Sequence, residues 1–322
     1  MIEAEKLTRA YGSFKAVDEV SFRITRGEVV GLLGHNGAGK STIMKMLTGF
    51  LEPSSGRVRI DGLDLVTELA AAQARVGYLP ENCPVWPEMT VIDFLDYQAA
   101  LHGMDPEQRP AAIRRALERT QLMDRAEQSI GTLSRGYRQR VGVAQAILHQ
   151  PKVLILDEPT NGLDPGQIHH MRALVRELAQ EATVILSTHI LQEVEAVCDR
   201  VIILRAGRVA VDARLDELAA SDRLCVEAGG TPDELRERLT GMPGLLQLEV
   251  STAGQGRVRA WLRATDGGAE ALAPEAARRL AEAGIPVFRL EPETRDLDRV
   301  FREVSEAEAT DFVDTQEVVA HA

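Results

Sequence analysis

The sequence lacks any run of roughly 18–20 apolar residues, the length that a helix needs to cross a bilayer. Its longest apolar stretches, such as Val153–Leu156 and Val201–Leu204, have the length of buried strands. The N-terminal residues Met1–Arg9 are partly charged and lack the apolar core of a signal peptide. We therefore expect this chain neither to span a membrane nor to carry a signal peptide.

Cysteine and positive charge are also scarce. Cys83, Cys198 and Cys225 are widely separated, which fits a reducing cytosol and provides neither a disulfide framework nor a zinc site. Lys and Arg number 37 against 49 Asp and Glu, a formal net charge of −12. Because coating a nucleic acid requires a cationic field, this balance argues against such a protein, although it leaves a local basic patch possible in principle.

What is present is an ordinary globular composition. The 322 residues are 44% hydrophobic and 27% charged, and a chain of this length can bury a large core in two domains. Residues 1–32 are rich in short strands, and residues 88–150 are mostly helical. Strands and helices alternate over 151–211, which predicts a parallel sheet with crossover helices. The fold class is therefore α/β.

A second unit follows. Residues 222–304 show a β-α-β-β-α-β order that predicts a small α+β domain of ferredoxin-like organisation, with its last helix at 295–304. Residues Glu303–Ala322 contain six acids and no Lys or Arg. We expect residues 305–322 to be a flexible acidic tail.

A phosphate-binding loop follows the apolar strand Val29–Leu33 and opens a helix. Its glycines let backbone N–H groups surround phosphates, and the helix N-terminus adds a positive dipole end. Lys40 is suited to the β- and γ-phosphates, and the Ser41 hydroxyl to Mg²⁺. The loop consists of Gly34, His35, Asn36, Gly37, Ala38, Gly39, Lys40, Ser41 and Thr42.

A pair of acids ends a second apolar strand, Val153–Leu156. Such a strand delivers carboxylates to the edge where α/β sheets bind ligands. Asp157 is suited to hold Mg²⁺ through water, and Glu158 to act as the general base on the attacking water. The pair is a weak signal alone, but behind a phosphate-binding loop it predicts a nucleoside triphosphatase.

Three further segments identify the type of nucleoside triphosphatase. Leu133–Arg140, Asn161–Pro165 and Ser187–His189 follow in the order of the signature segment, D-loop and switch histidine. Together with the phosphate-binding loop and the acidic pair, these segments make residues 1–212 resemble the ATP-binding-cassette (ABC) ATPases nearly from end to end. The resemblance implies a parallel-sheet core, an N-terminal antiparallel β subdomain and a helical subdomain at about 82–148.

The resemblance also implies residue roles. Tyr11 would stack on adenine, with a surface aromatic as the alternative, and His189 would contact the γ-phosphate. Ser134, Gly136 and Asp164 would contact the nucleotide held by a second cassette, so that ATP joins two cassettes, most simply two identical copies. The implied cofactors are ATP and Mg²⁺.

Two positions depart from the usual family pattern. Arg135 and Tyr137 stand within the signature segment where the family has glycine and glutamine. Glu81, at the end of the loop Arg75–Glu81, stands where most relatives carry a glutamine that binds Mg²⁺. An ionised carboxylate only accepts hydrogen bonds, so Glu81 is the weakest of the metal candidates beside Ser41 and Asp157.

These departures resemble one branch of the family, the exporters whose cassettes act in gliding motility, sodium extrusion and drug resistance. In that branch the membrane-spanning subunits are separate chains, and the cassette works in the cytoplasm at the inner face of the membrane. Leu297–Phe301 resembles the branch's terminal helix. The helical subdomain would contact the membrane subunits, with Pro84, Trp86 and Pro87 either lining that contact or packing the loop.

Two other functions remain open at this stage. One is an ABC ATPase without a transport role that acts on nucleic acid or ribosomes, against which stand the net charge and the lack of coiled-coil inserts. The other is a regulatory nucleotide-binding module without turnover. The presence of Lys40, Asp157, Glu158 and His189 argues against that reading.

Overall fold

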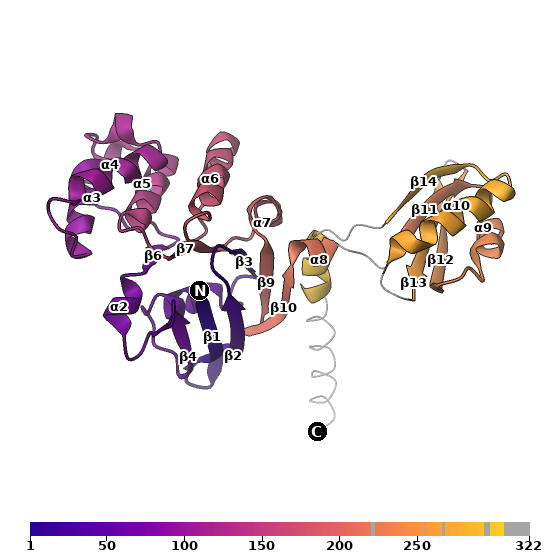
Figure 1. Ribbon diagram of the computed structural model, residues 1–322, viewed down its shortest axis with the longest axis horizontal. Coiled ribbons are helices and arrows are strands. Elements are labelled where there is room, and N and C mark those ends of the chain that lie inside the picture. The colour runs from indigo at the N-terminus through magenta and orange to yellow at the C-terminus, as the bar shows by residue number, and fades with distance from the viewer. Residues whose placement is uncertain (220–222, 255, 266–267, 293–296, 306–322) are drawn as a thin grey trace, which may run out of the picture. The chain divides into compact units, whose positions relative to one another are not determined.

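The chain forms two units in the computed structural model, which describes residues 1–219, 223–254, 256–265, 268–292 and 297–305 (Figure 1). The first unit is Met1–Leu215 together with Val304–Ala322, and the second is Asp216–Glu303. The sequence predicted units at 1–212 and 222–304. Of the acidic tail predicted at 305–322, only Ser305 is among the described residues.

An antiparallel sheet forms the N-terminal part of the first unit. Its order is β2-β1-β4-β5, and Val20, Phe22 and Ile24 alternate inward along β2 because successive side chains of a strand face opposite ways. Its strands are β1 (Ile2–Tyr11), β2 (Phe14–Ile24), β4 (Ser55–Ile60) and β5 (Leu63–Asp64). The expected N-terminal β subdomain is therefore present.

The central sheet has the order β10-β9-β3-β8-β7-β6. All neighbours run parallel except the edge strand β10, which pairs antiparallel with β9. Every residue of β3, β7 and β8 is buried, as expected for a parallel sheet covered on both faces. The strands are β3 (Val29–Leu33), β6 (Val76–Leu79), β7 (Val153–Asp157), β8 (Thr183–Ser187), β9 (Arg200–Arg205) and β10 (Arg208–Arg214).

Helices connect these strands and cover the sheet. Strand β6 corrects the sequence analysis, which treated Arg75–Glu81 as a loop, because four residues at a sheet edge give little periodicity. Two apolar clusters lie on the two faces of the sheet, one with β1, β2, β4 and α1, the other with α3–α6. The helices are α1 (Lys40–Leu47), α2 (Leu69–Gln73), α6 (Pro165–Leu178) and α7 (Leu191–Val197). Helix α8 (Leu215–Ala219) follows the last strand, β10, at the start of the second unit.

The predicted helical subdomain is a separate group of helices beside β6 (Figure 1). Thr90 and Ser134 cap α3 and α5, because each side chain accepts a hydrogen bond from a backbone N–H in the first turn. The helices are α3 (Val91–Leu101), α4 (Arg109–Arg119) and α5 (Arg135–Ile147), with short 3₁₀ turns at Met123–Arg125 and Ile130–Thr132.

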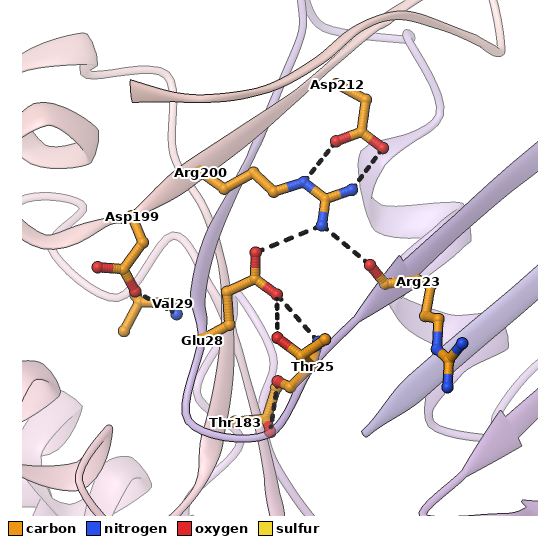
Figure 2. Close-up of polar contacts among 8 residues, drawn as sticks. All are labelled: Arg23, Thr25, Glu28, Val29, Thr183, Asp199, Arg200 and Asp212. Carbon is orange, nitrogen blue, oxygen red and sulfur yellow. Dashed lines mark hydrogen bonds and ion pairs between the residues drawn. The ribbon is translucent and has the colours of Figure 1, made fainter. Parts of the chain in front are cut away.

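A cluster of ion pairs and hydrogen bonds around Arg200 lies at the amino ends of the central strands (Figure 2). The Arg200 guanidinium donates two hydrogen bonds to Asp212 at 2.6 and 2.7 Å, one to the Arg23 carbonyl at 3.0 Å and one to Glu28 at 3.3 Å. Burial raises the pKa of Glu28, but hydrogen bonds from Thr25 and the nearby Arg200 outweigh it and leave that pKa below its usual value. The guanidinium therefore joins β9, β10 and the loop before β3.

The second unit has a four-stranded antiparallel sheet in the order β12-β13-β11-β14. Leu224, Val226, Val258 and Leu280 are among the residues of its own apolar cluster. The second helical segment is a 3₁₀ turn, Ala269–Leu272, followed by α10, and the start of the helix predicted at 295–304 lies outside the described residues. The elements are β11 (Arg223–Gly229), α9 (Pro232–Leu239), β12 (Leu245–Gly254), β13 (Arg257–Ala264), α10 (Ala273–Glu282) and β14 (Val287–Pro292).

No helix in the described residues is long and apolar enough to cross a membrane.

The first unit has an open groove of about 700 Å³ between the central sheet and the helical group. At its rim Phe50 and Leu101 are 79% and 64% exposed. The rings of His102 and His149 stack in its wall with centroids 3.9 Å apart.

His149 is held in its neutral form. Its Nε2 lies 3.1 Å from the Val76 carbonyl, which can only accept, so Nε2 carries the proton. Within the described residues, Nδ1 is buried without a hydrogen-bond partner. Burial, with a smaller contribution from His102, lowers the pKa of His149 to about 4.

Acid should therefore destabilise the first unit through His149. The folded state holds this ring neutral down to about pH 4, whereas in the unfolded chain it protonates near the usual histidine pKa of 6.5, so stability falls as pH drops from 6.5 towards 4. At pH 5.0 the loss is about 2 kcal/mol relative to pH 7.5. The difference in urea-unfolding free energy between these two pH values should shrink by that amount in His149→Gln. An unchanged difference would contradict this assignment.

Candidate functional site

The candidate site lies where three neighbouring strands of the central sheet end. Strands β3, β8 and β7 are adjacent and parallel, so their carboxyl ends meet at one edge. The phosphate-binding loop follows β3, Glu158 follows β7, and Thr188 and His189 follow β8. Segments more than a hundred residues apart in sequence are thereby brought together, as open α/β sheets do at ligand sites.

The loop before α1 has a backbone that only glycine tolerates at its last turn. Gly39 has φ +105°, and a Cβ there would lie 2.6 Å from the Ala16 carbonyl oxygen. The Lys40 ammonium at the start of α1 donates hydrogen bonds to the Gly34 carbonyl at 2.6 Å and to the His35 carbonyl at 3.2 Å. Lys40 is only 9% exposed. Burial lowers its pKa, an effect that the nearby carboxylates Glu158 and Asp157 oppose.

Asp157, the last residue of β7, is 3% exposed. The Ser187 hydroxyl at the end of β8 donates to its carboxylate, and the two residues pair across the parallel strands. The same Ser187 hydroxyl accepts a hydrogen bond from the Glu158 N–H at 3.1 Å, as does the Ser187 carbonyl. One serine side chain therefore fixes both acids.

Glu158 has an unusual backbone conformation. Its φ of +50° lies in the left-handed region, which costs free energy for a residue with a side chain and is found at functional sites. The carboxylate lies 2.9 Å from Nδ1 of His189. Burial raises the pKa of Glu158, and the charges of His189 and Lys40 oppose that rise. A buried carboxylate is thus held against a histidine whose own side chain is 58% exposed.

The other predicted contact residues form a second group on α5 and α6. Ser134 caps α5, with its hydroxyl 3.4 Å from the Tyr137 N–H, and Asp164 caps α6, with a carboxylate oxygen 3.0 Å from the Gln167 N–H. The helices touch at Gly136, where a Cβ would lie 1.8 Å from the Gln167 amide oxygen. Ser134, Gly136 and Asp164 are thus brought together by the fold.

Three predicted residues lie at the margins of the site. Tyr11 is 50% exposed with the Arg9 guanidinium 4.8 Å from its ring centre, so its outer face is available for stacking. His35 is exposed on the phosphate-binding loop, and its Nε2 lies 2.6 Å from the Ser305 hydroxyl. Glu81 is exposed, yet near enough that its charge partly opposes the lowering of the Lys40 pKa by burial.

The sequence analysis missed three polar residues that organise the site. Ser187 was read only as part of the switch segment, although a hydroxyl ending a buried strand is a usable signal. Thr160 and Glu193 have no such signal. The Glu193 carboxylate is 3% exposed on α7 and accepts hydrogen bonds from Thr160 and Thr188.

Comparison with known proteins places these features in a family. Residues 17–161 match the family described as ABC transporter. The chain is 40% identical over 217 residues to an uncharacterized ABC transporter ATP-binding protein, YdbJ, of Bacillus subtilis, a match that covers 67% of this chain and 70% of that protein. It is 37% identical to the bacitracin transport ATP-binding protein BcrA of Bacillus licheniformis, with 70% and 74% covered.

A solved structure shares the fold of the first unit. The dimeric structure of MJ0796, a bacterial ABC transporter cassette, superposes with a TM-score of 0.61 at 25% identity. The match covers 66% of this chain and 98% of that cassette. Nearly the whole of that cassette is therefore present here.

Proposed function

The chain belongs to the ABC transporter family, and we propose that it is the ATP-binding and ATP-hydrolysing subunit of an exporter whose membrane-spanning subunits are separate chains. The observation that carries the proposal is the convergence of Lys40, Glu158 and His189 at the ends of three adjacent strands. The bacitracin transport protein among its relatives supports an exporter.

ATP hydrolysis needs positioning and charge more than covalent chemistry. The N–H groups of the loop after β3 and the start of α1 would hold the phosphates, with the Lys40 ammonium on the β- and γ-phosphates. Glu158 would take the proton of the attacking water, and His189 would orient Glu158 through the 2.9 Å contact while sensing the γ-phosphate. Tyr11 would stack on the adenine.

The donor set fits Mg²⁺, which prefers oxygen ligands and retains several waters. Ser41 and Asp157 are the residues that would hold it, and the buried Asp157 carboxylate is already oriented by Ser187. Glu81 is exposed and contributes charge rather than a fixed position. When bound, the ion would neutralise charge on the phosphates.

Dimerisation would complete the site. The group formed by Ser134, Gly136 and Asp164 stands on α5 and α6, whereas Lys40 stands on α1. We propose that the helix N-terminus at Ser134 binds the γ-phosphate held by a second copy of this chain, as two cassettes assemble around two nucleotides. The dimeric cassette of similar fold supports this arrangement.

Replacing Glu158 should uncouple binding from hydrolysis. Glu158→Gln keeps the size of the side chain but removes the base, so phosphate release should fall about 10²-fold or more. ATP binding should persist, and size-exclusion chromatography with ATP and Mg²⁺ should show a stable dimer. Glu88→Gln, at an exposed glutamate, is the matched control and should hydrolyse ATP at the parental rate. Parental turnover in Glu158→Gln would overturn the assignment, and absence of turnover in the parent would favour a regulatory module.

The groove between the central sheet and the helical group is our proposed docking surface for the membrane subunits. It is lined by apolar and aromatic residues such as Phe50, Tyr78, Pro84 and Leu101. Of the loop residues considered above, Pro84 lines the groove, whereas the Pro87 carbonyl accepts hydrogen bonds within the helical group. The rings of Trp86 and Tyr97 pack with centres 4.7 Å apart and planes tilted by 39°. Docking here would hold the chain at the inner face of the membrane.

A charge in this groove should break assembly without stopping hydrolysis. Leu101→Glu places a carboxylate where an apolar segment would be buried, which should reduce the membrane subunit recovered with the tagged cassette about tenfold or more. Basal ATP hydrolysis should stay within about twofold of the parent, because Leu101 lies outside the catalytic group. Leu246→Glu, at an exposed leucine in the second unit, is the control and should leave recovery unchanged. Full recovery with Leu101→Glu would contradict docking at this groove.

A non-transport role on nucleic acid or ribosomes is the second candidate. No specific observation favours it, and the net charge of −12 opposes it.

A further inference from the structure

A buried carboxylate on α7 joins two loops of the site. One Glu193 oxygen accepts hydrogen bonds from the hydroxyls of Thr160 and Thr188, the latter at 3.1 Å. All three side chains are nearly inaccessible, with Glu193 3%, Thr160 5% and Thr188 0% exposed. The other Glu193 carboxylate oxygen is buried without a hydrogen-bond partner among the described residues, so the carboxylate is held by two threonine hydroxyls, both from loops rather than from its own helix.

The two loops have different tasks in the proposed mechanism. Thr188 directly precedes His189, and its hydroxyl also accepts the Ile190 N–H at 3.1 Å, which shapes the turn into α7. Thr160 lies between Glu158 and Asp164, in the loop that leads to α6. The Glu193 carboxylate therefore links the loop that carries His189 to the loop that follows Glu158.

The same Thr160 loop touches the second group of site residues. Gly162 has φ +73°, and a Cβ there would lie 2.5 Å from the guanidinium carbon of Arg135. Arg135 directly follows Ser134 at the start of α5. The contacts thus run from the Ser134 segment through Gly162 and Thr160 to Glu193, and from there to Thr188 and His189.

We propose that Glu193 is a positioning residue for ATP hydrolysis: it holds His189 in place against Glu158 by anchoring Thr188 to the Thr160 loop. The inference rests on the roles proposed above for His189 and Glu158. Loss of the anchor frees the turn at Thr188, and a misplacement of the order of 1 Å at a catalytic group is enough to slow a reaction strongly. Glu193 itself contacts neither Lys40 nor its loop in any interaction recorded for the described residues.

The test compares two substitutions of similar size. Glu193→Met removes the acceptor, whereas Glu193→Gln keeps a carbonyl oxygen that can accept from both threonines. We expect kcat to fall about tenfold or more in Glu193→Met, with KM for ATP within about threefold of the parent, and kcat in Glu193→Gln to stay within about threefold. Circular dichroism and the thermal midpoint report whether each variant folds.

Thr188→Val provides a second route if Glu193→Met fails to fold. It removes only the hydroxyl on the histidine side and should lower kcat in the same direction with KM unchanged. Equal loss of kcat in Glu193→Met and Glu193→Gln would overturn the proposal, because the hydrogen bonds would then not be the cause. Parental kcat in Glu193→Met or in Thr188→Val would overturn it as well.

A double mutant separates positioning from general stabilisation. If Glu193 acts through His189, Glu193→Met should cost no further rate in a His189→Ala background, measured under single-turnover conditions. If the rate losses of the two single variants multiply in the double variant, the proposal for Glu193 is overturned, whereas the role of His189 is unaffected. Parental turnover in His189→Ala alone would instead contradict the role proposed for His189, so the two failures are distinguishable.

Discussion

The arrangement of the first unit depends on two adjacent carboxylates buried at the end of β7. Asp157 and Glu158 are 3% and 8% exposed, and charges removed from water must be compensated by partners. Ser187 donates to the first, His189 meets the second, and Lys40 faces both. Ser187 ends β8, His189 follows that strand, and Lys40 begins the helix after β3, so the order β3-β8-β7 brings these partners to the acidic pair. The geometry of the candidate site follows from compensating this charge.

The amino ends of the same strands are held by a different set of contacts, those of Arg200. Arg200 ties Asp212, Glu28 and a backbone carbonyl at the amino ends of the strands, where no chemistry is proposed. Four hydrogen bonds from its three guanidinium nitrogens are directed at these acceptors, which suits a planar guanidinium. One end of the sheet is therefore bound tightly to its connections, while loops at the other end carry the reactive groups. Function resides in those loops because a rigid frame positions them.

Motifs with local spacing were the predictable part of the site. The phosphate-binding loop needs glycines where its backbone has positive φ, as at Gly39 with φ +105°. The spacing of these glycines therefore predicts the loop from the sequence. Caps such as Thr90 and Ser134 were equally readable, because capping depends on a few neighbouring residues. The short edge strand Val76–Leu79 was misread, since its pairing with β7 is a long-range interaction that leaves little local periodicity.

The amino-acid sequence by itself determined the fold class, the parallel core and the identities of Lys40, Asp157, Glu158 and His189, because motif spacing and hydrophobic alternation are local properties. Only the tertiary structure decided which side chains meet. It placed Glu193 between Thr160 and Thr188, laid Arg135 on Gly162 and stacked His102 on His149. From the sequence, an acid on a helix is predicted to be exposed to solvent, and only the packing of that helix shows that it is buried. Contacts between segments distant in the chain depend on the assembled sheet, and no local pattern encodes them.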